Sequence, residues 1–176
     1  MATVQLCIDH PRAEGGGVTF TRFYAEQLPR LIRFLVSAGV PQGDAIDAAQ
    51  EAFIAAYARW GEIQQPSAWI RTVARRAALR SRTSVMEEPV GGTEELARIG
   101  RAPSCSSTNE ASLFYVLLGA LPSTQRLVMA WIIDGYSIDE VARALSIKPS
   151  SVRSNLRHAR LRLGRAYEKY ESEEAV

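Results

Sequence analysis

Apolar residues recur at intervals of three and four over most of this 176-residue chain, which is the spacing of amphipathic helices. Three such segments lie within residues 18–82, and four lie within residues 109–170. Residues 83–108 between them mix Pro, Gly, Ser, Thr and Glu without apolar periodicity, which is typical of a linker. The pattern therefore predicts an all-α fold of two small helical domains joined by a flexible acidic linker.

The first predicted domain, residues 18–82, contains three helices. The first has an apolar stripe, ended by Gly39 and Pro41, that consists of Phe20, Phe23, Tyr24, Leu28, Leu31, Ile32 and Leu35. We expect Asp44 to cap the second helix and Gly61 to stop it. The inward residues of this second helix are predicted to be Ile46, Ala49, Phe53, Tyr57 and Trp60.

The third predicted helix opens at Pro66 and is rich in arginine. Its inward residues are predicted to be Ile70, Val73, Ala74 and Ala77. Arg71, Arg75 and Arg82 are expected on the opposite side, and Arg76 and Arg80 flank that side. Five arginines on one short helix exceed what solubility requires and indicate an anion-binding face, with a solvated face as the alternative.

Residues 137–160 have the pattern of a helix-turn-helix within the second domain. Ser137 and Glu140 have the spacing of a capping box, and Pro149 fits the first position of a second helix after a short break. The inward stripe of that second helix is Val152, Leu156, Ala159 and Leu163. Its outer side chains can reach base edges and phosphates of duplex DNA, and they are Ser150, Ser151, Arg153, Ser154, Arg157 and His158. The alternative is a solvated basic helix in an ordinary α-helical domain.

The net charge of +2 is unevenly distributed along the chain. Residues 18–82 hold nine arginines against five acids, and residues 121–165 hold eight basic residues against three acids. Residues 83–112 hold five glutamates against two arginines. Since basic blocks attract the phosphate backbone and an acidic connector is repelled by it, the two domains are expected to contact nucleic acid.

Other classes of protein are disfavoured by what the sequence lacks. It has no apolar run of membrane-spanning length and no secretion signal, so a cytoplasmic location without membrane insertion is expected. Cys7 and Cys105 fall in the predicted tail and linker, and Cys7-x-x-His10 has no second ligand pair, so no metal site is expected. With only His10 and His158 and no phosphate-binding loop, we expect neither an enzyme nor a cofactor.

Three segments in order resemble the bacterial RNA polymerase sigma factors of the extracytoplasmic-function group in the sigma-70 family. They are DAIDAAQEAFIAAYARW at Asp44–Trp60, PSAWIRTVARRAALR at Pro66–Arg80, and the segment Leu121–Leu163 that contains the helix-turn-helix. The resemblance implies a region 2 domain at residues 18–82 and a region 4 domain at residues 109–170. Residues 1–17 are then a mobile N-terminal tail and residues 171–176 an acidic tail.

The resemblance also implies partners and roles. Asp47, Gln50 and Glu51 match positions that dock on core RNA polymerase. The loop that captures an unstacked base of the minus-ten element corresponds to Gly61, Glu62, Ile63, Gln64 and Gln65. Phosphates near that element are expected to be held by Arg71, Arg75, Arg76 and Arg80.

In the region 4 domain the resemblance assigns the minus-thirty-five element to the helix-turn-helix. Arg153, Ser154, Arg157 and His158 are expected to read bases, while Arg126 and Ser150 or Ser151 touch phosphate. An anti-sigma factor is a further expected partner. Lys148 stands where the family commonly has a small hydroxyl cap, and Ile46 stands where it commonly has an acid.

Two other functions remain open at this stage. One is a sigma-like decoy that binds an anti-sigma factor and not DNA; the arginines on two helices disfavour it. The other is a helix-turn-helix regulator that acts without core polymerase. Such a regulator leaves the basic third helix and the acidic linker unexplained.

Overall fold

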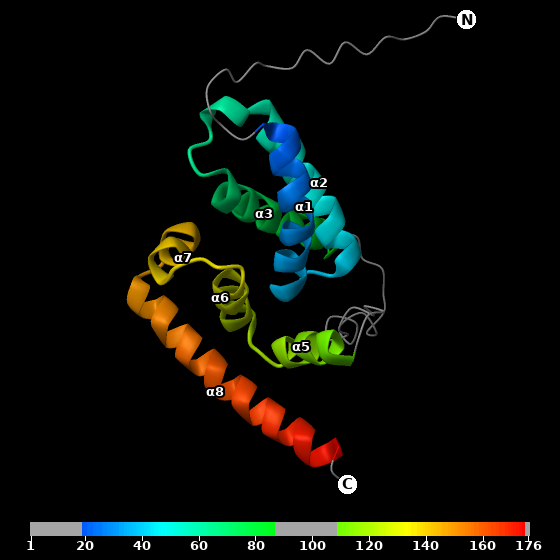
Figure 1. The fold of residues 1–176 in the computed structure, drawn as a ribbon, viewed down its shortest axis with the longest axis vertical. Helices are drawn as coiled ribbons and strands as arrows, with labels where there is room; N and C mark the ends of the chain where they lie inside the picture. The colour runs from blue at the N-terminus through cyan, green and yellow to red at the C-terminus, as the bar shows by residue number, and fades with distance from the viewer. Residues whose placement is uncertain (1–18, 87–108, 175–176) are drawn as a thin grey trace, which may run out of the picture.

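The structure, a computed structural model, describes residues 19–86 and 109–174. Within these ranges every regular element is a helix, which confirms the all-α prediction (Figure 1). The predicted N-terminal tail, most of the predicted linker and the last two residues lie outside the described ranges, and so do Cys7 and Cys105. None of the described helices is long and apolar enough to cross a membrane.

The first domain consists of α1 (Phe20–Ser37), α2 (Gln42–Ala58), the short 3-10 helix η1 (Trp60–Glu62) and α3 (Pro66–Met86). Proline opens α3 as predicted, and α3 continues four residues past the expected boundary at 82. Aromatic rings join the start of α1 to the end of α2: Trp60 lies 5.2 Å from Phe20 and 4.8 Å from Phe23, centroid to centroid. These contacts fix η1, and with it the loop that leads into α3.

Three details of the predicted second helix are wrong. The helix starts at Gln42 with Pro41 as its N-cap, so Asp44 lies inside the first turn, and the helix ends at Ala58, before Gly61. Ile46 and Tyr57 are exposed instead of inward-facing. The buried face is formed mainly by alanines, which allow α2 and α3 to approach closely: Ala45, Ala48, Ala49, Ala52 and Ala56.

The second domain consists of α5 (Asn109–Gly119), α6 (Ser123–Ile133), α7 (Ile138–Leu145) and α8 (Pro149–Glu174). The predicted capping box is confirmed: the Ser137 N–H donates to Glu140 Oε2 at 2.8 Å, and the Glu140 N–H donates to Ser137 Oγ at 3.4 Å. Gly135, at φ 95°, directly follows Asp134, the C-cap of α6. Helix α8 begins at Pro149 as predicted and continues to Glu174, so its C-terminal part extends beyond the other helices (Figure 1).

The two domains pack against each other, which the sequence did not predict. Helix α1 contacts α6, and α3 contacts α7. At the centre of this interface the ring of Phe34 on α1 lies edge-on to that of Trp131 on α6, with 5.0 Å between centroids. Trp131 in turn lies 4.8 Å from Tyr136 and is fully buried. The hydrophobic core therefore runs continuously from one domain into the other.

Candidate nucleic-acid interface

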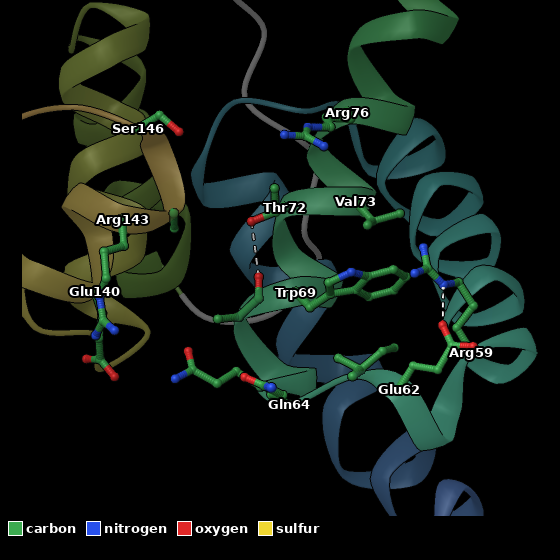
Figure 2. Close-up of a pocket in the computed structure, with 14 residues that line it drawn as sticks. Arg59, Glu62, Gln64, Trp69, Thr72, Val73, Arg76, Glu140, Arg143 and Ser146 are labelled. Carbon is green, nitrogen blue, oxygen red and sulfur yellow. Dashed lines mark hydrogen bonds and ion pairs between the residues drawn. The ribbon is translucent and has the colours of Figure 1, made fainter.

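A cavity of about 580 Å³, lined by both polar and apolar side chains, lies between the loop after η1 and helix α7 (Figure 2). On the first-domain side it is lined by Glu62, Ile63, Gln64, Gln65 and the aromatic ring of Trp69, among others. Glu140, Arg143 and Ser146 face it from the other domain, as Figure 2 shows. The predicted base-capture residues from Glu62 to Gln65 are thus brought together on one wall, and Gly61 precedes them as an exposed residue of η1.

One exposed ion pair spans the turn that leads into this loop. Arg59 Nε donates to Glu62 Oε2 at 3.0 Å across the 3-10 turn (Figure 2). Gln64 and Gln65 are exposed, and Trp69 is half-buried beside them on the first turn of α3. Amide groups next to an indole ring can hydrogen-bond and stack with an unpaired base.

The arginines of α3 do not lie as predicted. Arg76 and Arg80, expected to flank the outer side, are the exposed ones, and Arg75 is half-buried. Burial, and then the neighbouring charge of Arg76, lowers the pKa of Arg75. An anion bound beside Arg75 and Arg76 would offset the repulsion between their positive charges. The side chain of Arg82 lies outside the described part.

Arg71 is the clearest correction, because it is 2 % exposed and faces the second domain. Its Nε pairs with the carboxylate of Asp134, which follows α6. The position that helical periodicity placed outward is covered by another domain. In this arrangement Arg71 cannot reach a phosphate.

The predicted polymerase-docking residues lie together on the exposed face of α2. Asp47, Gln50 and Glu51 are all exposed, and Glu51 pairs with Arg80 of α3. Sequence reasoning missed Ile54, whose side chain is 73 % exposed on the same face. Ile54 follows Gln50 by four residues and Glu51 by three, so helical spacing alone could have placed it on their face.

The outer face of α8 is open in the structure. Ser150, Arg153, Ser154, Arg157 and His158 are exposed, and Ser151 is half-buried. The predicted inward stripe is confirmed by complete or nearly complete burial of Val152, Leu156 and Ala159, with Leu163 half-buried.

Arg126, expected to touch a phosphate, is engaged within the protein. Its Nη2 donates to the backbone carbonyl of Gly119 at 2.6 Å and to that of Leu121 at 3.3 Å. Burial lowers its pKa. The Arg126 side chain also packs against Gly39 of the first domain. A Cβ atom added at Gly39 would lie only 2.6 Å from Arg126 Nη1. Arg126 Nη2 is thus engaged within the protein, and the phosphate contact expected of this half-buried side chain stays a prediction.

Sequence comparison with known families matches both domains. Residues 23–85 match the family model for sigma-70 region 2, and residues 112–163 match the model for sigma-70 region 4. The chain belongs to the sigma-70 family. The two matched regions and their order agree with the extracytoplasmic-function group that the sequence resembles. A search of curated proteins finds no match to this sigma factor.

Two solved complexes have a similar fold. One is the sigma factor RpoE with the anti-sigma factor NepR from Bartonella quintana; it is 22 % identical, with a TM-score of 0.68 over 85 % of this chain and 96 % of that one. Another is CnrH with the cytosolic domain of CnrY, at 23 % identity and a TM-score of 0.58 over 85 % and 88 % of the two chains. At these identities the likeness establishes the fold of the sigma factor.

Within the described residues no three His, Cys, Asp or Glu side chains cluster in a way that could hold a metal ion. The site surfaces offer instead guanidinium, amide and hydroxyl donors on helices. Sigma factors are non-enzymatic transcription factors, and these groups are suited to binding rather than to bond breaking.

Proposed function

We propose that this sigma factor binds core RNA polymerase and directs it to specific promoters. It reads the minus-thirty-five element with the helix-turn-helix and melts the minus-ten element with the first domain. The observation that carries the proposal is the presence, on one chain, of an exposed basic reading face on α8 and a polar loop beside exposed arginines on α3. We assign residues 18–82 to region 2, residues 83–108 to the linker and residues 109–170 to region 4.

Core polymerase docks on the exposed face of α2. Asp47, Gln50 and Glu51 lie on the same exposed face of α2 as the apolar side chain of Ile54. An exposed isoleucine next to polar groups suits a protein interface with an apolar centre and a polar rim. The exposed ion pair between Glu51 and Arg80 is weak and opens at little cost when either partner is needed elsewhere.

The loop from Gly61 to Gln65 captures a base that leaves the duplex. Unstacking a base costs a few kcal/mol, which stacking and hydrogen bonds in the pocket must offset. Trp69 supplies a ring, and Gln64 and Gln65 supply donors and acceptors. Arg75, Arg76 and Arg80 hold the neighbouring phosphates, so melting is driven by binding energy and needs no nucleotide hydrolysis.

Helix α8 enters the major groove at the upstream element. Arg153, Ser154, Arg157 and His158 contact bases, and Ser150 and Ser151 at the helix N-terminus contact phosphate. The solved RpoE complex contains an anti-sigma factor, and we propose a protein of that class as a further partner.

Reconstituted transcription tests this function. The full chain is mixed with core polymerase and a library of genomic fragments, and transcript 5′ ends are sequenced. We expect transcripts from a defined set of promoters only when both proteins are present. Tight promoter binding by the chain alone, without transcripts, would support a regulator; anti-sigma binding without either activity would support a decoy.

A further inference from the structure

The side chain of Arg71 is the most completely enclosed cation that the structure describes, and groups from both domains surround it. Its Nη1 donates to the Ser67 carbonyl oxygen at 2.7 Å and to Gln27 Oε1 at 3.2 Å, both within the first domain. Its Nε pairs with Asp134 of the second domain. The guanidinium carbon lies 5.9 Å from the Phe34 ring centroid and 5.2 Å from that of Tyr136.

Asp134 is placed where its charge needs such a partner. It is the C-cap of α6, and the negative end of a helix dipole disfavours a carboxylate there. Its side chain is only 16 % exposed, so solvent does little to stabilise the charge. Arg71 supplies the compensating positive charge from across the domain boundary. A buried pair of this kind is strongly coupled, because removing one partner leaves the other charged and poorly solvated.

The closed arrangement is incompatible with simultaneous contact to both promoter elements. The names minus-ten and minus-thirty-five imply a separation of about 25 base pairs, or about 85 Å at 3.4 Å per base pair. In the structure, α7 of the helix-turn-helix lies across a single cavity from the base-capture loop (Figure 2). The two DNA-binding surfaces must therefore move apart before both elements can be bound.

We propose that Arg71 and Asp134 form a latch that holds the free sigma factor closed, and that Arg71 exchanges the Asp134 carboxylate for a promoter phosphate on opening. This inference rests on the proposed function for its second half. The exchange explains why an arginine of the basic helix α3 is buried: the same guanidinium has two alternative anions. Loss of one contact is offset by gain of the other, so opening is coupled to DNA binding.

Distance measurements between the domains test the latch directly. Cys7 and Cys105 are replaced by serine in the full chain, and dyes are attached through Glu26→Cys on α1 and Glu168→Cys on α8, both exposed positions. We expect a single high-transfer population. Asp134→Asn, which keeps the side-chain shape, should shift the ratio of open to closed molecules by about tenfold or more. A strongly favoured closed form would hide this shift. The comparison is therefore repeated in chains that carry Phe34→Ala, in which the aromatic contact between the domains is weakened.

Asp139→Asn is the matched control, because it removes an exposed carboxylate of the same domain. It should leave the transfer efficiency unchanged, and Asp134→Asn should add nothing when Arg71→Met is already present. Far-UV circular dichroism verifies that each variant is folded. An open wild-type chain, an unmoved Asp134→Asn variant or an equal effect of Asp139→Asn would overturn the latch.

Transcription separates the latch from the proposed function. With limiting core polymerase, Asp134→Asn should yield more transcript than the wild type, and Asp139→Asn should not. If distances shift as expected but no variant supports transcription, the latch stands and the proposed function fails. If transcription occurs and the distances do not move, the latch fails and the function stands.

Discussion

At the scale of single residues, the arginines of this protein show how surroundings decide the role of a side chain. Arg153 on α8 is exposed, Arg75 on α3 is half-buried, and Arg71, one turn earlier on α3, is enclosed by two domains. Helical periodicity treats Arg71 and Arg75 alike, because it counts only neighbours on the same helix. The difference between them comes from α6, more than fifty residues away.

We expect Arg153→Ala or Arg157→Ala to cost about 1 to 3 kcal/mol of binding at a matched minus-thirty-five element, because a guanidinium that bonds two base acceptors is lost. Competition binding of the polymerase complex to promoters with single base changes measures this loss and the accompanying relaxation of base preference. Arg165→Ala, an exposed change farther along α8, is the control for net charge. Unchanged selectivity in both variants would count against base reading by these residues.

At the scale of elements, the helix-turn-helix was predictable because its signals are local. The capping box needs only Ser137 and Glu140, and Pro149 marks the next helix by its own backbone restriction. Helix α2 was harder. Its buried face is built from alanines, whose weak apolar signal was overridden by the stronger signals of Ile46 and Tyr57, and those two side chains are exposed.

We expect Ser137→Ala to lower the free energy of unfolding by about 1 kcal/mol at neutral pH, because the first turn of α7 loses its cap. Hydrogen bonds from Ser137 lower the pKa of Glu140. A depressed carboxylate pKa stabilises the fold above the unfolded-state value, about 4.3, and this contribution is lost as pH falls through the folded-state value.

Urea denaturation at pH 7 and pH 3 measures both effects. The difference in free energy of unfolding between wild type and Ser137→Ala should be smaller at pH 3 than at pH 7. Ser123→Ala, at the first residue of α6, should stay within about 0.5 kcal/mol of wild type, since the structure has no side-chain cap there. A difference in free energy of unfolding that is larger at pH 3 than at pH 7 would exclude the stabilising role of the Glu140 carboxylate.

At the scale of the whole molecule, the two-domain, all-helical organisation could be predicted, but the contact between the domains could not. Phe34 lies at the edge of the apolar stripe of α1, three turns after Phe23, and this edge forms a second covered surface. What covers that surface depends on Trp131 and Tyr136, which are remote in sequence. The polar loop after η1 and the exposed face of α8 were predictable from sequence, whereas the burial of Arg71 and the internal hydrogen bonds of Arg126 were not, because both depend on residues remote in sequence.

The central claim is that one chain contacts two separated promoter elements while bound to core polymerase. A hydroxyl-radical footprint of the polymerase complex on a promoter from the reconstituted system tests it most directly. We expect two protected segments about 85 Å apart along the duplex, with the upstream segment alone lost in Arg153→Ala. A single protected segment, or the same footprint from the chain without core polymerase, would contradict the account.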